Sequence, residues 1–266
     1  MKIITSTQNN TIKQLLQLQS KAKSRKEHKQ FVVEGRRELD LAHANGYSIQ
    51  TVYWCPEIFE ELHFMNWREQ FNETIDFVRV SLSVYQKMVM REKTEGLIGI
   101  VLQKTQSLKE FHPKNDNPLI IVLESIEKPG NLGAVLRTAD AAAVDAVLIT
   151  EQHTDIHNPN VIRSSVGGFF SVPIFVCSNE EAYNFMSSRN IKIYAASLQK
   201  SKEYSLCDYL HASAFVMGSE AIGLSKFWNK EGIEAVKIPM LGHVDSLNVS
   251  VATAVLTYEA IRQRNP

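Results

Sequence analysis

The sequence has little cysteine and no long apolar run, and both shortages argue against whole classes of protein. Its three cysteines, Cys55, Cys177 and Cys207, are odd in number and far apart, and no CxxC pair occurs. This pattern argues against a disulfide framework or a zinc site, so we expect no metal and a reducing cytoplasmic setting. No apolar run approaches the length of a membrane span, and the N-terminal MKIITSTQNN lacks the apolar core of a signal peptide.

Net charge is also absent, because 29 basic residues balance 29 acidic ones. The balance conceals a positive block, since residues 1–37 carry nine lysines and arginines against Glu27 and Glu34, which is nine minus two, or +7. Such a block is typical of a surface that binds nucleic acid. It is also typical of an ordinary solvated helix face, so by itself it favours RNA or DNA only weakly.

What the sequence does contain is an alternation of strand-like and helix-like segments, in a chain long enough for two domains. Over residues 1–105 the alternation predicts a small α/β domain. We expect its strands at 30–35, 49–55, 76–81 and 96–103, and its helices at 10–30, 36–46, 57–71 and 83–91.

A polar stretch with two prolines predicts a linker at residues 106–117, and the alternation resumes in residues 118–266. We expect strands there at 119–124, 145–150, 172–176, 191–195, 214–217 and 235–239, and helices at 131–143, 159–166, 179–189 and 247–264 with a short one near 225–230. A strand–helix repeat of this kind implies a largely parallel sheet covered by helices on both faces.

The segment PGNLGAVLRTADAAAV, residues 129–144, follows a strand that we expect to be buried. Asn131 is a suitable cap for the helix that begins there. Arg137 falls off the apolar stripe of that helix, one turn beyond Gly133, and burying a guanidinium without a partner is costly. Either the helix turns an edge to solvent at Arg137, or a site needs a fixed cation there, with room for a ligand beside Gly133.

The segment VMGSEAIGLS, residues 216–225, carries a strand into Gly218, and glycine lets a backbone approach a ligand closely. Glu220 is placed to accept a hydrogen bond from Arg137 or from an adenosine-like group. It is equally suited to complement a helix dipole. No GxGxxG fingerprint occurs in the chain, which disfavours a classical dinucleotide site.

The third segment, residues 238–264, contains a loop and then the long helix predicted at 247–264. We expect Asp245 or Ser246 to cap this helix. A helix needs only one capping side chain, so capping explains the presence of one of Ser246 and Asn248 better than the presence of both. The helix has two apolar stripes, which predict burial on two sides, one against its own sheet and the other against a second subunit. The stripes are Val249, Ala252 and Leu256, and Val251, Val255 and Tyr258.

Taken together, these segments resemble the SpoU/TrmH family of RNA ribose 2'-O-methyltransferases, within the SPOUT superfamily. The matches to the family's three motifs occur in the family's order and cover most of residues 119–264. They are Asn131-Leu132-Gly133-Ala134 with Arg137-Thr138-Ala139, then Gly218-Ser219-Glu220 through Gly223-Leu224, then Ile238-Pro239-Met240 through Ser246-Leu247-Asn248-Val249-Ser250 and Ala252. The segment NVIRSSVGGFFSVPI, residues 160–174, is similar to a further family segment. Residues 1–105 resemble, more loosely and through FVVEGRRELDLA, the small RNA-binding domain that many members carry.

The resemblance implies an α/β SPOUT domain at residues 118–266, with a mostly parallel sheet, a trefoil knot, a homodimer and S-adenosylmethionine as the methyl donor. It implies that Gly218, Ile238 and Leu247 bind the cofactor. It further implies a catalytic set of Asn131, Arg137, Glu220, Ser246 and Asn248, with Arg137 near the ribose hydroxyl. A guanidinium keeps its proton in proteins, so we expect Arg137 to stabilise developing charge rather than to act as a base.

Ribosomal RNA is the substrate that we expect, because a separate domain at residues 1–105 suits a folded RNA element; tRNA is the alternative. A second hypothesis is a non-catalytic RNA-binding protein, against which the intact set of Arg137, Glu220 and Asn248 argues. A third is a nucleotide-dependent α/β enzyme of another kind, for which no phosphate-binding loop is present.

Overall fold

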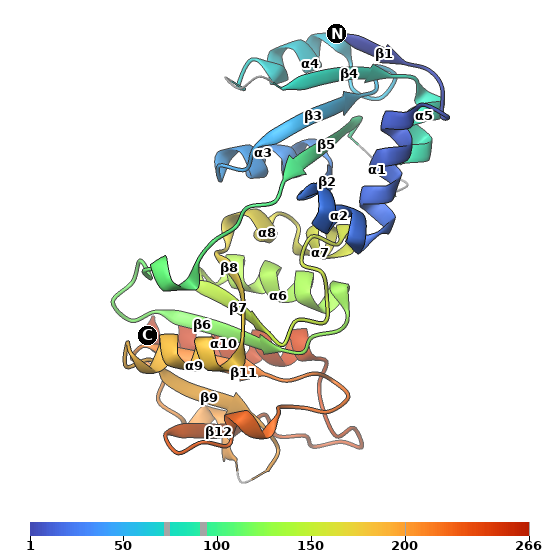
Figure 1. Ribbon diagram of the computed structural model, residues 1–266. Coiled ribbons are helices and arrows are strands. Elements are labelled where there is room, and N and C mark those ends of the chain that lie inside the picture. The colour runs from blue at the N-terminus through green and yellow to red at the C-terminus, as the bar shows by residue number, and fades with distance from the viewer. Residues whose placement is uncertain (72–74, 91–94, 200, 266) are drawn as a thin grey trace. The chain divides into compact units, whose positions relative to one another are not determined.

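The computed structural model describes residues 1–71, 75–90, 95–199 and 201–265, which form two compact units (Figure 1). The N-terminal unit consists of residues 1–105 and 157–170, and the C-terminal unit consists of residues 106–156 and 171–266. Nothing in the sequence pattern indicated that residues 157–170 would pack with the first 105. Within the described residues, none of the helices combines the length and the apolarity of a membrane span.

The N-terminal unit is built on a five-stranded mixed sheet. Its strands are β1 (Lys2–Ile4), β2 (Gln30–Glu34), β3 (Ile49–Trp54), β4 (Asp76–Val80) and β5 (Leu97–Leu102), in the spatial order β1-β4-β3-β5-β2. Strand β5 runs antiparallel to β2 and β3, whereas β4 is parallel to β1 and β3. The helices are α1 (Asn10–Ser20), α2 (Ala22–His28), α3 (Arg36–Ala44), α4 (Glu61–Arg68), α5 (Leu82–Met88), α7 (Pro159–Ser165) and α8 (Gly168–Ser171).

The helix predicted at 10–30 is two helices, because Lys21 is extended (φ −120°) and ends α1. Arg25 of α2 is buried and donates hydrogen bonds to the carbonyls of Leu18 (2.6 Å) and Gln19 (3.0 Å). These carbonyls lie in the last turn of α1, where no helical partner remains for them. Arg25, one of the cations of the positive block, therefore has a structural role at this break. Strand β1 was not predicted, and residue 91 of the helix predicted at 83–91 lies outside the described residues.

Residues 157–170 are an integral part of the N-terminal unit. The aromatic rings of Phe169 and Phe31 meet edge to face, with centroids 5.7 Å apart. Gly167 has φ +98°, and a Cβ atom there would lie 2.3 Å from a methyl carbon of Leu41. Only glycine combines this backbone conformation with so close a neighbour. The turn after α7 is therefore shaped to fit the core formed by residues 1–105.

The C-terminal unit is built on a seven-stranded sheet in which every described pairing is parallel. Its strands are β6 (Leu119–Glu124), β7 (Ala146–Thr150), β8 (Ile174–Cys177), β9 (Lys192–Ala196), β10 (Lys202–Glu203), β11 (Ser213–Met217) and β12 (Ile233–Lys237), in the order β10-β12-β9-β11-β6-β7-β8. The mostly parallel sheet predicted from the sequence is thus confirmed, and the short edge strand β10 is an addition to it.

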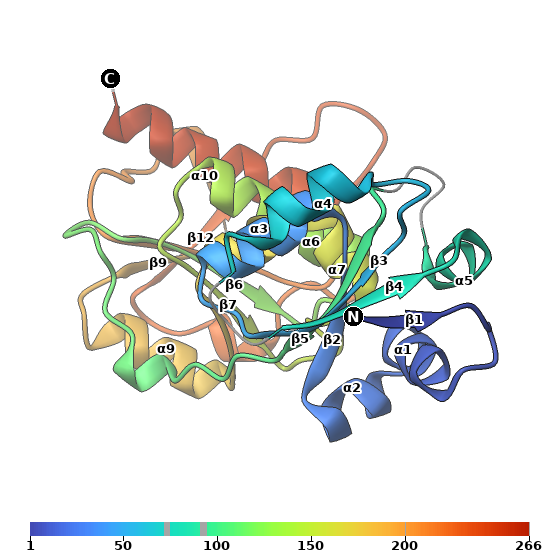
Figure 2. The ribbon, with the colours of Figure 1, turned by 90° about the horizontal axis from the view of Figure 1, so that it is seen from above.

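Helices cover both faces of this sheet, as the strand–helix repeat predicted. The helices are α6 (Pro129–Ala141), α9 (Asn179–Ser187) and α10 (Val249–Arg264), with the short 3₁₀ turns η1 (Leu108–Glu110), η2 (Tyr204–Leu206) and η3 (Lys226–Trp228). Helices α6 and α10 pack together on one face, and α9 lies on the other (Figure 2). All six residues of β6 are buried between these layers.

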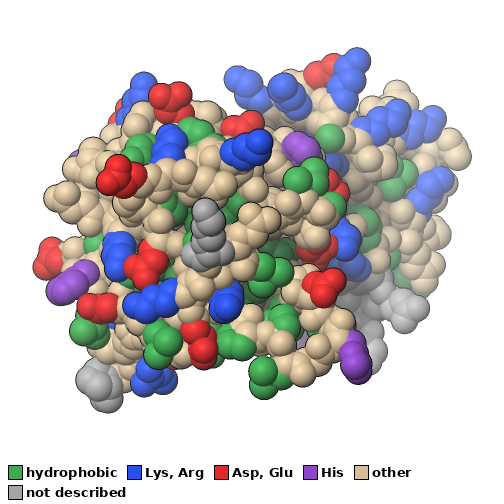
Figure 3. All heavy atoms as spheres, turned by 90° about the horizontal axis from the view of Figure 1, so that it is seen from below, with side chains coloured by type: hydrophobic (Ala, Val, Ile, Leu, Met, Phe, Trp, Pro, Cys, Tyr) green, Lys and Arg blue, Asp and Glu red, His purple; other side chains and the backbone are tan. Residues whose placement is uncertain are grey.

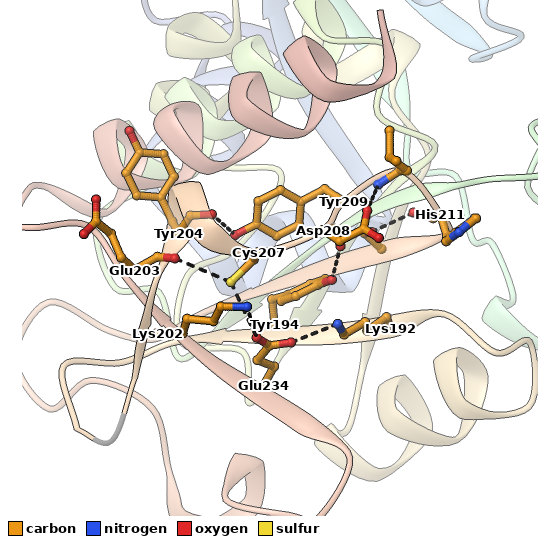
Figure 4. A network of polar contacts seen from close by, with 12 residues as sticks. Lys192, Tyr194, Lys202, Glu203, Tyr204, Cys207, Asp208, Tyr209, His211 and Glu234 are labelled. Atoms are coloured by element: carbon orange, nitrogen blue, oxygen red, sulfur yellow. Dashed lines mark hydrogen bonds and ion pairs between the residues drawn. The ribbon is translucent and has the colours of Figure 1, made fainter. Parts of the chain in front are cut away.

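A polar network joins the edge strands near the amino ends of β9 and β12 (Figure 4). Glu234 of β12 lies 2.9 Å from Lys192 of β9 and 3.7 Å from Lys202 of β10. The hydrogen bond from Lys192 is the largest cause that lowers the pKa of Glu234. We interpret the network as an attachment of the edge strands to the sheet.

The surface of the protein seen from below mixes acidic, basic and hydrophobic side chains (Figure 3).

Candidate active site

A large cavity of the C-terminal unit lies at the carboxyl ends of the parallel strands, where open α/β sheets hold their ligands. Its volume is about 520 Å³, which is within the usual range for small-molecule sites. Its walls come from segments that follow three strands, at 197–199, 218–224 and 238–247, and from the start of α10. Gly218, Ile238 and Leu247, the three residues expected to bind the cofactor, all line it.

Gly218 is needed for the shape of its own loop. A Cβ atom at this position would lie 2.2 Å from the backbone carbonyl carbon of Gly223 and 2.4 Å from the backbone nitrogen of Leu224. The loop is further closed by a hydrogen bond of 2.9 Å from the Gly223 N–H to the Ser219 carbonyl. Gly218 therefore lets the beginning of the segment 218–224 approach its end closely. The backbone of this segment then faces the cavity.

The residues around the cavity suit a ligand with an apolar and a polar part. Ile238 and Leu247 are half-buried, and Leu256 of α10 is only 1% exposed. The backbone of Gly218 and Gly223 borders the same space without a side chain. Apolar walls with a few polar backbone groups are typical of sites that hold a nucleoside-like molecule. The walls therefore fit a cofactor of the S-adenosylmethionine type.

The carboxylate of Glu220 is the point at which the three sequence segments meet. Its Oε1 accepts hydrogen bonds from Asn131 Nδ2 (2.8 Å) and Asn248 Nδ2 (2.7 Å), and its Oε2 accepts one from Lys128 Nζ (2.5 Å). Asn248 Nδ2 also lies 3.2 Å from Asn131 Oδ1. We call Lys128, Asn131, Glu220 and Asn248 the Glu220 cluster. It joins the N-terminus of α6, the loop after β11 and the N-terminus of α10.

The electrostatics of the cluster favour an ionised Glu220. The hydrogen bond from Lys128 is the largest cause that lowers the pKa of Glu220, and the bond from Asn131 lowers it further. The same contact raises the pKa of Lys128. A carboxylate that already accepts three hydrogen bonds holds protons poorly. Glu220 therefore serves as an acceptor that orients the two amides, and it is unsuited to act as a general base.

Asn248 is the N-cap of α10, which corrects the prediction that Asp245 or Ser246 caps a helix beginning at 247. Its Oδ1 accepts hydrogen bonds from Ser250 N (3.0 Å) and Ser250 Oγ (2.6 Å), and the helix begins at Val249. Asparagine can do this because its oxygen caps the helix while its nitrogen remains free to donate. Capping thus explains Asn248 and not Ser246. Asn248 also donates a hydrogen bond to Glu220.

Asn131 is not a helix cap, contrary to prediction. Helix α6 begins two residues earlier, at Pro129, and Lys128 is its N-cap residue without a side-chain capping bond. Proline suits the first helical position because its φ is already helical and the N–H that it lacks would have no helical partner. Asn131 therefore lies in the first turn, where its side chain is available to Glu220.

Arg137 lies apart from the Glu220 cluster. Its side chain is exposed and makes no hydrogen bond or ion pair with any residue that the structure describes, so the expected bond to Glu220 is not formed. Six positions along a helix are about 1.7 turns, so Arg137 and Asn131 leave α6 on different faces. The helix thus turns an edge to solvent at Arg137. Gly133 is itself buried.

Ser246 is exposed and borders the large cavity, but it makes no hydrogen bond among the described residues. Five residues were expected to be catalytic. Asn131, Glu220 and Asn248 meet in the cluster, Ser246 borders the large cavity, and Arg137 lies on α6 away from both. Sequence reasoning missed Lys128, although it directly precedes Pro129. Its contact with Glu220, 92 residues further on, depends on tertiary structure that no local pattern shows.

A second cavity, of about 190 Å³, adjoins the first at the cluster. Lys128 and Asn131 line only this smaller cavity, whereas Ser219, Glu220 and Val249 line both. Thr154 fixes the loop that presents Lys128, because its buried hydroxyl lies 2.7 Å from the Ile126 carbonyl oxygen. The cluster therefore lies where the two cavities adjoin. Among the described residues, no group of three or more His, Cys, Asp or Glu side chains is arranged to hold a metal ion.

Comparison with known families matches both parts of the chain. Residues 118–258 match the model described as the SpoU rRNA Methylase family. Residues 9–99 match the MRM3-like substrate binding domain. The match at 118–258 contains the Glu220 cluster and all the residues expected to bind cofactor.

Individual relatives resemble the chain over most of its length. It is 27% identical to a 23S rRNA (uridine(2479)-2'-O)-methyltransferase of Streptomyces viridochromogenes, over 88% of this chain and 83% of that protein. It is 28% identical to a 23S rRNA (guanosine-2'-O-)-methyltransferase of Escherichia coli, over 79% of this chain and 93% of that protein. A crystal structure of an AdoMet-bound rRNA methyltransferase from Sinorhizobium meliloti is 27% identical, has a TM-score of 0.90, and aligns over 98% of this chain and 97% of its own.

Proposed function

Because the chain belongs to the SpoU rRNA methylase family, we propose that it methylates a ribose 2'-hydroxyl of ribosomal RNA. The family predicted from the three motifs is confirmed by the match over residues 118–258, and the predicted donor by the AdoMet-bound relative. Ribosomal RNA is the proposed substrate because both curated relatives act on 23S rRNA. The observation that carries the proposal is the Glu220 cluster at the junction of two cavities.

The larger cavity is the proposed site of S-adenosylmethionine, held by Gly218, Ile238 and Leu247. When bound there, S-adenosylmethionine supplies an electrophilic methyl group. The chain itself must hold the ribose hydroxyl near that group, because proximity and orientation account for much of such a rate enhancement. Asn131 and Asn248, oriented by Glu220, are the proposed residues for this positioning.

Arg137 is proposed to act on the RNA. Its guanidinium has no partner among the described residues and is exposed, so it is available to a phosphate of the substrate. A fixed cation also stabilises the negative charge that develops on the ribose oxygen as its proton leaves. Ser246 borders the large cavity and is proposed to complete the site.

A homodimer is proposed from the surface of α10. Val251 and Tyr258, which belong to the second apolar stripe, are 48% and 49% exposed, while Leu256 of the first stripe is buried. An apolar stripe that its own unit leaves uncovered is suited to a second copy of the chain. We further propose that the SPOUT domain contains a trefoil knot.

The N-terminal part is proposed to bind RNA. We divide the chain into an RNA-binding domain at 1–105, a linker at 106–117 and the methyltransferase domain at 118–266. The substrate-binding family match at residues 9–99 supports this division. Of the nine cations in residues 1–37, eight are exposed, Arg25 being the exception. RNA affinity should therefore fall steeply with salt concentration, because phosphate contacts release counterions. The proposed location is the cytoplasm.

Mapping ribose methylation in total RNA from cells with and without the gene tests the proposal. We expect one 2'-O-methyl group in 23S rRNA to disappear with the gene and to return when purified protein and S-adenosylmethionine are added to the unmodified RNA. Loss of a tRNA methylation instead would favour the tRNA alternative. If no methylation changed and the protein bound RNA but not S-adenosylmethionine, the non-catalytic alternative would hold.

A further inference from the structure

Glu124, the last residue of β6, is a buried carboxylate outside the Glu220 cluster. It is only 2% exposed and lines neither cavity. Its Oε2 accepts a hydrogen bond from the Ser225 backbone N–H (2.7 Å), and its Oε1 accepts bonds from Ser225 Oγ (2.6 Å) and Asn179 Nδ2 (2.6 Å). Three short hydrogen bonds therefore converge on one side chain.

A buried carboxylate needs such compensation, because its transfer out of water is costly when it is unpaired. No lysine, arginine or histidine forms an ion pair with Glu124 in the part of the chain that the structure describes. The carboxylate is therefore held by neutral donors alone. An ionised carboxylate only accepts hydrogen bonds, which matches the donors that Ser225 and Asn179 present.

Ser225 directly follows the segment 218–224, which forms one wall of the large cavity. The tip of this segment is open to solvent, with Ile222 86% exposed. Strand β11 fixes its beginning, and Glu220 connects it to the Glu220 cluster two residues before the tip. The two bonds from Ser225 to Glu124 fix its end. We call the segment 218–225 the cofactor loop. Its end is thus hydrogen-bonded to β6 through Ser225 and Glu124.

We propose that Glu124 is a positioning residue for the cofactor: it fixes the end of the cofactor loop through Ser225 and so sets the affinity for S-adenosylmethionine without touching it. The identity of the ligand rests on the proposed function. Glu124 acts on the loop in the same way whichever RNA is methylated.

The test is Glu124→Gln in the full chain, with binding of S-adenosylmethionine measured by titration calorimetry. Glutamine keeps the shape but has one acceptor oxygen, so it cannot accept hydrogen bonds on both sides as the carboxylate does, and at least one present bond from Ser225 or Asn179 is lost. We expect about tenfold weaker binding, the usual consequence of losing a hydrogen bond to a charged group. Hydrogen exchange at the amides of residues 218–225 should become faster, while the amides of β6 keep their protection.

Asp145→Asn is the matched control, because Asp145 is a buried carboxylate beside the other end of β6. It accepts hydrogen bonds from Leu119 N (2.9 Å) and Asn115 Nδ2 (3.0 Å), remote from the cofactor loop. A merely structural role for Glu124 predicts that both amide variants lower the melting temperature and leave the affinity unchanged. Our proposal predicts that only Glu124→Gln weakens binding.

Ser225→Ala is the second variant and removes only the hydroxyl donor, on an exposed residue whose replacement does not threaten folding. It should weaken binding severalfold and in the same direction. Wild-type affinity in both Glu124→Gln and Ser225→Ala would overturn the inference. A wild-type chain that binds no S-adenosylmethionine would instead overturn the proposed function, so the two failures are distinct.

Discussion

The side-chain amide of Asn131 donates to the carboxylate of Glu220 over 2.8 Å, across 89 positions of sequence. This bond ties the first turn of α6 to the loop after β11. Asn248, at the start of α10, donates to the same oxygen over 2.7 Å. Because the two amides share one acceptor, a displacement of either helix end alters the geometry of the other. The cluster therefore behaves as one unit, and its members should not be replaceable one at a time.

Asn248→Asp should separate helix capping from the cluster. Aspartate caps a helix as well as asparagine does, so the melting temperature should stay near that of the wild type. It replaces an amide donor by a second carboxylate facing Glu220, so we expect the methylation rate to fall by at least about tenfold. Asn158→Asp is the matched control, because Asn158 caps α7 through Asn160 N at 2.9 Å and lies far from the cluster in sequence. Equal activity of the two variants would contradict the role of Asn248.

Gly218→Ala should damage cofactor binding before it damages stability. The added Cβ would meet the backbone of residues 223 and 224 at 2.2–2.4 Å, and backbone cannot move aside without changing the loop. We expect at least tenfold weaker binding of S-adenosylmethionine in calorimetry. Gly242→Ala is the control, since a Cβ there has no described atom within 4 Å. If both variants bound the cofactor like the wild type, the cofactor would not depend on the shape of the 218–224 loop.

Lys128→Met should move the acid limb of the activity profile to higher pH. Lys128 holds the pKa of Glu220 below its ordinary value, so the cluster's contribution is complete above about pH 4.3 and is lost as the pH falls through the lowered pKa. Without Lys128 the pKa of Glu220 returns toward that ordinary value, so protonation begins at a higher pH. The profile of kcat/KM between pH 3.5 and 7 measures the shift. Lys226→Met, which removes an exposed lysine of η3, should leave the profile unchanged.

Local sequence patterns predicted the parallel sheet well, because the alternation of strands and helices is a short-range feature of the sequence. Gly218, Ile238 and Leu247 were expected from the family resemblance, and all three line the cavity at the carboxyl ends of the parallel strands. Asn248 was predicted as a site residue and lies in the Glu220 cluster, although the capping of α10 was assigned to its neighbours.

Contacts between distant segments were not predictable in this way. No local pattern distinguishes Lys128, Glu124 or Arg25 from other charged residues, yet each has a specific partner in the folded chain. The same holds for residues 157–170, whose pattern predicts a helix but not that it packs within the N-terminal unit. Such contacts depend on the relative placement of elements, which hydrophobic periodicity does not encode.

Tyr258→Asp should weaken the proposed dimer. Tyr258 is 49% exposed on the apolar stripe of α10, so an aspartate there costs the isolated chain little but would be buried and unpaired in an interface. Light scattering after size exclusion should report twice the 30.1 kDa chain mass for the wild type and a concentration-dependent monomer for the variant. The exposed Glu61→Asp of α4 serves as the control. A wild-type chain that is monomeric and fully active would rule out this use of the stripe.

Arg137→Ala should reduce catalysis more than any other exposed change on α6 while sparing both stability and the cofactor. The side chain is exposed and without a polar partner among the described residues, so the folded chain loses no hydrogen bond or ion pair with it. Its proposed work is on the substrate, and removing one donor that stabilises developing charge typically lowers turnover by about 10²–10³-fold. Arg137→Lys should restore activity only in part, because a point charge does not replace the planar guanidinium.

Two measurements on Arg137→Ala decide between a role in catalysis and a role in the fold. Single-turnover methylation of the RNA should slow by the factor given above, while calorimetry with S-adenosylmethionine should give the wild-type affinity. Gly218→Ala should show the opposite order, with binding lost first, because its Cβ would displace the wall of the cavity. Normal turnover in Arg137→Ala would make the arginine a surface residue without a part in the reaction. A loss of cofactor affinity as large as that of Gly218→Ala would instead assign it to the cofactor site, which its exposed position on α6, outside both cavities, argues against.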